Sequence, residues 1–163
     1  MRTTVGLLVA LAIFSAAIFL HPPAALAQGL PASDTREIRS YVLTEAALDK
    51  YVNATRNLST IRLDCTDDGS GVDSLAAAAA KIDAVPGATQ AVRSAGLTSR
   101  EYVVFAFALI ENAYAAYAID QPGGELPPGV SMANVEFFRK HAGEIAKLGD
   151  ETEVAGCEEG EGA

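Results

Sequence analysis

The stretch GLTSREYVVFAFALIENAYAAYAID, residues 96–120, decides the fold class of this chain. Its start has the chemistry of a helix N-terminus, because Thr98 and Glu101 are spaced as a capping box. In that motif each side chain accepts a hydrogen bond from the backbone N–H of the other residue. The residues placed for a hydrophobic staple over the same cap are Leu97 and Tyr102. A helix is therefore predicted from Ser99 to about Ile119.

Only Glu111 and Asn112 are frankly polar between Tyr102 and Ile119, so this segment must be tested as a membrane span. Its apolar length approaches the roughly 20 residues that a spanning helix needs. However, a capping box begins it, and the Pro- and Gly-rich residues 120–130 end it, as is typical of globular helices. We therefore expect no membrane span but the central helix of a bundle, with two polar groups that need partners or a route to solvent.

The rest of the chain is also predicted to be helical. Ser33 or Asp34 caps a first helix, and Ser131 caps the last one. No segment alternates polar and apolar residues for long enough to form a strand, and no internal repeat is present. The fold class is therefore all-α, a bundle of four main helices and one short helix. The predicted helices are 34–60, 75–84, 87–95 (the short one), 99–119 and 132–148.

Residues 1–27 have the layout of a secretory signal peptide. Arg2 gives a short positive start, Val5–Leu20 is an uncharged apolar run, and residues 25–27 (ALA) have the small-x-small pattern of a cleavage site. An uncleaved anchor is the alternative, but the apolar run is shorter than the roughly 20 residues that cross a bilayer. We expect export to a periplasm or to the cell exterior, with residues 28–163 as a single domain.

The chain is acidic, with 21 Asp and Glu against 12 Lys and Arg, a net charge of −9. Loss of Arg2 with the signal peptide would make that charge −10. Such a surface repels nucleic acid and anionic lipid, so no nucleic-acid partner is expected. Cys65 and Cys157 lack the CxxC spacing of redox and metal sites, and one disulfide between them is predicted in an oxidising compartment. The acidic C-terminal tail, residues 150–163, is expected to be disordered unless Cys157 holds it.

Few kinds of catalytic or metal site are compatible with this sequence. No G-x-S-x-G motif, P-loop, dinucleotide fingerprint or CxxCH haem motif is present, and no cofactor is predicted. The expected mature chain has one histidine, His141, with Glu144 three residues later, which leaves a mononuclear metal site as an open alternative. The Asp-rich residues 64–73 resemble a calcium loop, but Leu75 stands where such a loop needs a bidentate Glu.

Polar residues of two helices form the remaining candidate site. Glu45 lies close to the apolar arc of its helix, with an acid and an arginine near it on the same side. If that helix packs against 99–119, these groups meet the two polar residues of the central helix inside the bundle. Such a cluster is either a satisfied network that fixes helix register or a pocket for a small ligand or ion. The predicted ligand-binding residues are Glu45, Asp49, Arg56, Glu111, Asn112 and Tyr114, and the predicted metal ligands are His141 and Glu144.

A resemblance to other proteins is carried by the helix boundaries. The run Gly96-Leu97-Thr98-x-Arg100-Glu101-Tyr102, followed by Asn134-x-x-Phe137 and Glu144-Ile145, resembles a group of short exported α-helical bacterial proteins of unknown function. It covers roughly the C-terminal half of the chain. The resemblance implies an exported helical domain, and it carries no activity and no catalytic residue.

Three hypotheses for the function follow. The leading one is an exported, non-enzymatic helical domain that binds a protein partner or a small ligand in the cell envelope. The alternative is a periplasmic metal- or ligand-binding bundle that uses Glu45, Glu111 and His141. An enzyme with paired-carboxylate chemistry is the third, because two acids from different helices can converge in space.

Overall fold

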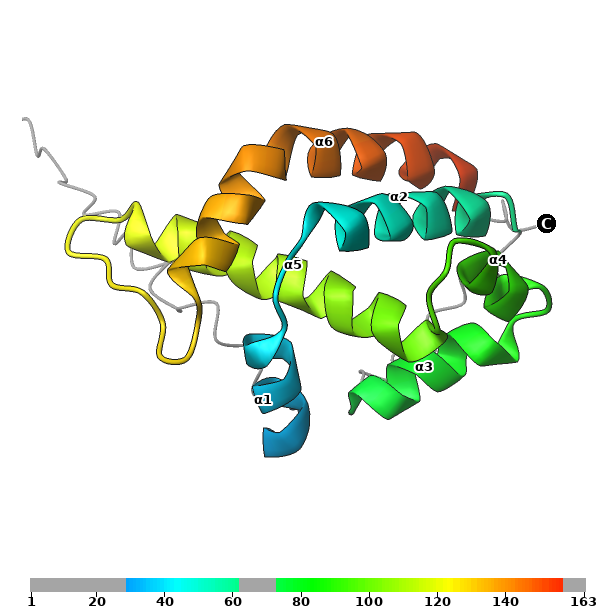
Figure 1. Cartoon of the computed structure of the whole chain (residues 1–163), viewed down its shortest axis with the longest axis horizontal. Coiled ribbons are helices and arrows are strands. Elements are labelled where there is room, and N and C mark those ends of the chain that lie inside the picture. Colours follow the sequence, from blue (N-terminus) through cyan, green and yellow to red (C-terminus); the bar gives the residue numbers. More distant parts are fainter. Residues whose placement is uncertain (1–28, 62–72, 157–163) are drawn as a thin grey trace, which may run out of the picture.

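The computed structural model describes residues 29–61 and 73–156, with the backbone alone for 152–156. Within these ranges the chain forms helices and no strand, so the all-α prediction is confirmed (Figure 1). The described residues contain one helix more than the sequence predicts. The helices are α1 (Ala32–Ser40), α2 (Glu45–Ser59), α3 (Leu75–Ala84), α4 (Ala88–Ser94), α5 (Ser99–Ile119) and α6 (Met132–Gly156).

The extra helix arises because the predicted first helix, 34–60, is wrong as a continuous element. Residues 41–44 are extended and separate α1 from α2, with φ −67° and ψ 133° at Tyr41 and φ −136° and ψ 154° at Thr44. Thr44 begins the second helix, since its hydroxyl accepts a hydrogen bond from the Ala47 N–H at 3.2 Å. A local Thr cap therefore competes with helix continuation at this point.

A side chain from α6 stabilises the extended segment. Asn134 accepts a hydrogen bond from the Leu43 N–H at 3.0 Å and donates one to the Tyr41 carbonyl at 2.7 Å. The amide thus supplies both backbone partners that a helix would otherwise have provided. Because these contacts join residues more than 90 positions apart, local sequence patterns do not reveal them.

The start of α5 matches its prediction closely. The Glu101 carboxylate accepts a hydrogen bond from the Thr98 N–H at 2.7 Å, and the Thr98 hydroxyl accepts one from the Glu101 N–H at 3.2 Å. Both halves of the capping box are therefore present. The staple residues Leu97 and Tyr102 belong to one apolar cluster beneath this cap.

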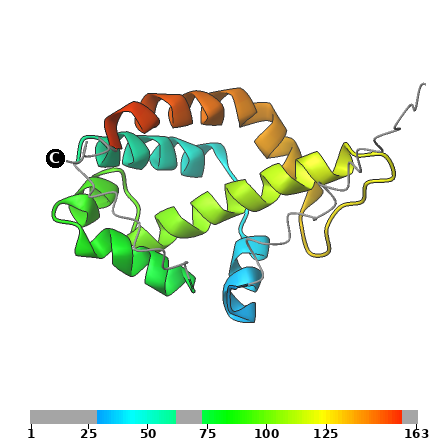
Figure 2. The ribbon, with the colours of Figure 1, turned by 180° about the vertical axis from the view of Figure 1, so that it is seen from behind.

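α5 is the central helix of the fold, as predicted. It packs against each of the other five helices, while α2 and α6 lie side by side along the molecule (Figure 1 and Figure 2). Its aromatic residues join the core: Tyr51 of α2 stacks on Tyr102 with ring centroids 5.0 Å apart and makes a tilted contact with Phe105 at 4.9 Å. The largest fully buried side chains are Phe105, Leu48, Leu75, Val92 and Val135.

By length and composition, α5 is also the one described helix that is apolar enough to cross a membrane. Its mean hydropathy is 1.5, and 44% of the relevant window is buried inside the structure. The core helix of a globular domain meets the same criteria, so this property is weak evidence for a span. The contacts of α5 with five other helices agree with its predicted role as a core helix.

The C-terminal helix is longer than predicted. α6 continues to Gly156, beyond the expected end near Leu148, so the first half of the acidic tail 150–163 is helical. Several predictions concern segments outside the described residues: the signal peptide 1–27, the calcium-like loop and the Cys65–Cys157 pair. The disulfide therefore receives no support from the structure and stays a prediction.

Candidate functional site

The predicted polar cluster is not formed, because its members pair with other residues. Glu111 of α5 accepts a hydrogen bond from Arg39 Nε of α1 at 2.7 Å, and this ion pair is half-buried. Arg56 instead contacts Glu151 of α6 at 3.2 Å, on the surface. Asp49 is exposed. The break at residues 41–44 explains the difference, since it turns α1 so that Arg39, which the sequence reasoning missed, reaches the central helix.

Asn112 is buried but makes only part of its possible hydrogen bonds. Its side chain is 3% exposed, and its Nδ2 donates to the Ala108 carbonyl one helical turn earlier at 2.7 Å. Its Oδ1 has no partner among the described residues. Asn112 therefore donates to its own helix and not to a carboxylate of the predicted cluster, and within the described residues its buried acceptor is unpaired in the middle of α5.

The structure does bring Glu45, His141 and Glu144 together. His141 Nε2 lies 3.0 Å from the Glu45 carboxylate, and its Nδ1 lies 3.2 Å from Glu144. The ring packs on Phe137, with centroids 4.5 Å apart. A hydrogen bond from Lys140, and secondarily one from His141, lowers the pKa of the exposed Glu45 carboxyl.

This arrangement is a poor metal site. The two carboxylates approach opposite nitrogens of His141, so an ion bound to either nitrogen would meet only one of them. Within residues 29–61 and 73–151, no three His, Cys, Asp or Glu side chains gather closely enough to hold a metal ion. The geometry favours a structural role: the His141 imidazole forms hydrogen bonds with Glu45 of α2 and Glu144 of α6, and so links the two helices.

The outer face of α5 carries an exposed apolar surface. Ile110, Tyr114 and Tyr117 are 41%, 39% and 61% exposed, although they belong to the central helix of the fold. Their spacing of four and three residues places them on one helix face. Half-buried alanines at 106 and 113 lie on the same face. We call these five residues the α5 outer face; it contains no charged side chain.

Sequence reasoning found only part of this surface. Tyr114 was among the predicted site residues, whereas Ile110 and Tyr117 were not. A helix that is apolar on all sides has no polar stripe to mark which side meets solvent, so its exposed face cannot be identified from periodicity. Among residues 29–61 and 73–151, the other exposed large hydrophobic residues are Val42, in the extended segment, and Met132, at the start of α6.

Comparisons with known proteins identify no relative of this chain. No protein-family model matches the chain, and no curated protein or solved structure matches it significantly. The resemblance carried by residues 96–102 therefore stays an expectation, and function must be argued from the geometry.

Proposed function

We propose that this protein is an exported, non-enzymatic helical domain that binds a protein partner in the cell envelope through the α5 outer face. The observation that carries the proposal is the exposure of Ile110, Tyr114 and Tyr117 on the central helix. Single exposed hydrophobic residues are ordinary, but a contiguous apolar face on a folded domain marks an interaction surface. Tyrosine is enriched at such surfaces because it buries a large area and keeps a polar tip.

The charge distribution supports a protein partner at this face. The whole chain has a net charge of −9, which opposes close approach to other acidic surfaces. The charged residues of α5 are Arg100 and Glu101 at its start and Glu111 in its second half, and Arg39 neutralises Glu111. An apolar partner surface can therefore dock here without desolvating an unpaired charge, which would be costly. The small alanines at 106 and 113 allow a partner backbone to come close.

The alternative, a metal- or ligand-binding bundle, has less support. Glu111 is engaged by Arg39, while Glu45 and His141 contact each other at another interface, so the three proposed ligands do not act together. Elemental analysis of the purified protein separates the two proposals. A stoichiometric transition metal would favour the alternative and contradict a purely protein-binding role.

Site-specific photocrosslinking in the native cells tests the proposal. A photoreactive amino acid replaces Tyr117, and in a matched control it replaces Val42, which is 69% exposed but belongs to the extended segment between α1 and α2. We expect a discrete crosslinked protein from position 117 and none from position 42. Equal products from both positions, or adducts to lipid alone, would contradict a protein-binding face.

The export part of the proposal has its own test. The N-terminal residue of the protein recovered from the cell envelope is identified by mass spectrometry. Cleavage after Ala27 predicts Gln28 as the first residue. Recovery of the chain with Met1–Leu20 intact would show instead that the N-terminal segment is retained.

A further inference from the structure

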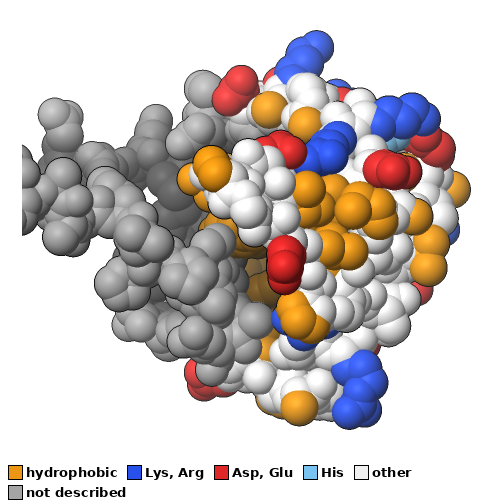
Figure 3. Space-filling model, turned by 90° about the vertical axis from the view of Figure 1, so that its left-hand side faces the viewer, with side chains coloured by type: hydrophobic (Ala, Val, Ile, Leu, Met, Phe, Trp, Pro, Cys, Tyr) orange, Lys and Arg blue, Asp and Glu red, His pale blue; other side chains and the backbone are white. Residues whose placement is uncertain are grey.

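A hollow of about 640 Å³ opens beside α1, and its chemistry differs from that of the α5 outer face. Small-molecule sites in proteins have volumes of roughly 300–1,000 Å³. Figure 3, which views the end of the molecule near the loop after α5, shows hydrophobic side chains gathered on this face. The lining residues are Leu30, Ala32, Thr35, Arg36, Arg39, Ser40 and Gly129.

Arg36 is a cation that lines this hollow and has no partner in the part of the chain that the structure describes. Four other arginines of the described residues form ion pairs, with Glu111, Glu151, Glu37 and Asp120. Arg36 has no hydrogen bond or ion pair with any described residue. Acidic residues outnumber basic ones by 21 to 12 in this chain, so a guanidinium without a carboxylate is available for an external anion.

Arg39 adds a second guanidinium that is held in place. Its Nε donates to Glu111, which leaves the two terminal nitrogens without a partner among the described residues. The loop before α6 contacts the other side of this arginine: a Cβ added at Gly129 would lie 3.2 Å from Arg39 Cδ. Gly129 also has a φ of +82°, which favours glycine, so the loop can approach the arginine closely.

We propose that this hollow binds a small organic anion, a carboxylate or a phosphate on an apolar body. The anionic group is held by the guanidinium of Arg36 and the terminal nitrogens of Arg39, since planar guanidinium groups bind oxyanions in paired hydrogen bonds. The apolar body lies against Leu30 and Ala32. This inference does not depend on the α5 outer face.

Calorimetric titration of the purified protein at fixed ionic strength tests the inference, with octanoate and octyl phosphate as probes and octan-1-ol as the neutral control. We expect saturable one-to-one binding of at least one anion, and the tighter of the two identifies the headgroup class. Arg36→Gln should weaken that binding by roughly tenfold or more, because a charge-assisted pair is lost. Arg36→Lys should weaken that binding less than Arg36→Gln does, because lysine keeps the charge but lacks the planar guanidinium group.

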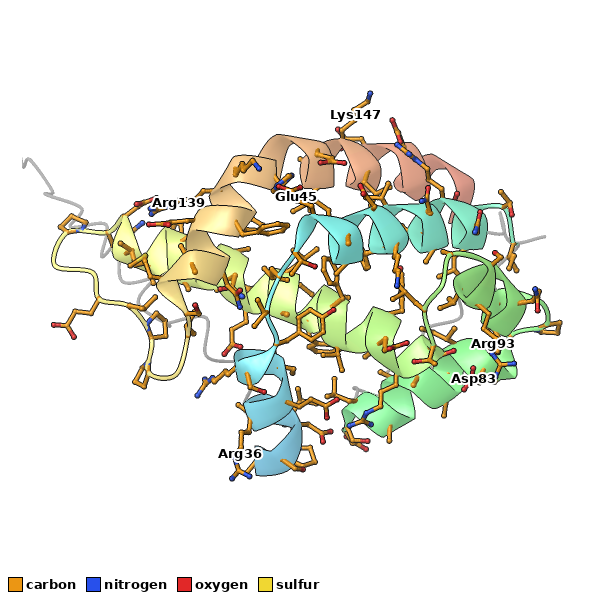
Figure 4. The ribbon with its side chains drawn as sticks, in the orientation of Figure 1. Arg36, Glu45, Asp83, Arg93, Arg139 and Lys147 are labelled. Atoms are coloured by element: carbon orange, nitrogen blue, oxygen red, sulfur yellow. The ribbon has the colours of Figure 1, made fainter. Side chains whose placement is uncertain are left out.

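Arg93→Gln is the matched control, because it removes the same charge from α4 at the far end of the molecule from Arg36 (Figure 4). It should leave the affinity within about twofold, given that exposed charges this far apart are screened by salt. Equal weakening by Arg36→Gln and Arg93→Gln would overturn the inference, as would octanol binding as tightly as octanoate or the absence of saturable binding. A protein that binds octanoate but gives no crosslink from Tyr117 would support this site and contradict the proposed function.

Discussion

At the scale of single residues, the amide of Asn134 joins α6 to the extended segment between α1 and α2. It bonds the backbone of Tyr41 and of Leu43, and it is itself 5% exposed. Without these contacts one buried donor and one part-buried acceptor would lose their partners, and an unsatisfied buried group costs about 1–3 kcal/mol. Asn134 therefore fixes the angle between α1 and α2, and through α1 it positions both arginines of the hollow.

Replacing Asn134 by Ala should lower the free energy of unfolding by about 2 kcal/mol, because both backbone groups of the extended segment are left unpaired. Urea denaturation followed by circular dichroism measures the change. Asn53→Ala serves as the control, since Asn53 is exposed on α2, and it should change stability by less than about 0.5 kcal/mol. Equal effects of the two substitutions would show that the bridge does not stabilise the fold.

For Asn112 we expect the opposite result, a substitution that makes the protein more stable. Its Oδ1 is buried without a partner among the described residues, and its Nδ2 donates only to the Ala108 carbonyl of the same helix. Substitution by Leu, which has a similarly branched shape, removes the unpaired acceptor and should stabilise the protein by about 1 kcal/mol. The midpoint of urea unfolding reports the result. A loss of stability in Asn112→Leu would mean that Oδ1 accepts a hydrogen bond that the protein needs.

At the scale of elements, the sequence predicts those helices whose ends are marked by local chemistry. The predicted limits of α3 and α5 agree with the structure, in which Ser74 and Thr98 cap the two helices and helix-breaking residues follow each of them. The division between α1 and α2 was missed because residues 41–44 contain neither Pro nor Gly. Thr44 was the available local signal, and its strength depends on a long-range contact with Asn134.

The contrast between local signals and long-range contacts also applies to the candidate site. The sequence marked Glu111 and Asn112 as residues that need partners, and this need follows from burying polar groups in an apolar helix. It placed Arg56 in the polar cluster with Glu111, whereas Arg39 is the arginine that pairs with Glu111, because partner choice depends on the angle between α1 and α2. Local patterns therefore identified the polar residues of α5 but not the three-dimensional pairing.

The capping box of α5 gives a pH-dependent prediction. Hydrogen bonds from the backbone, and then the side chain, of Thr98 lower the pKa of the Glu101 carboxyl below its ordinary value of 4.5. Because folding lowers this pKa, the stabilisation is fully present above pH 4.5 and is lost as the pH falls through the folded-state value. The stability difference between wild type and Glu101→Gln should therefore be largest near neutral pH and shrink below pH 4.5.

Thermal unfolding of both proteins across pH 3–7 measures that difference. Glu125→Gln is the matched control, because Glu125 is an exposed loop residue, and its effect should be small at every pH. A difference for Glu101→Gln that stays constant over this range would contradict the assignment of the ionised carboxylate to the cap.

At the scale of the whole molecule, α5 combines two roles that usually belong to different helices. It contacts all five other helices, and yet one of its faces presents Ile110, Tyr114 and Tyr117 to solvent. Exposed side chains contribute little to folding, so this face can change without loss of the fold. Stability and binding should therefore be separable on this helix, which is the central claim of the proposed function.

The most direct test introduces Ile110→Ser and Tyr117→Ser together and measures the yield of the crosslinked complex from a photoreactive residue at Tyr114. We expect the yield to fall about tenfold or more, while the free energy of unfolding changes by less than about 1 kcal/mol. Val42→Ser, tested in parallel, should preserve the yield. An undiminished yield in the double variant, with the fold intact, would contradict the account.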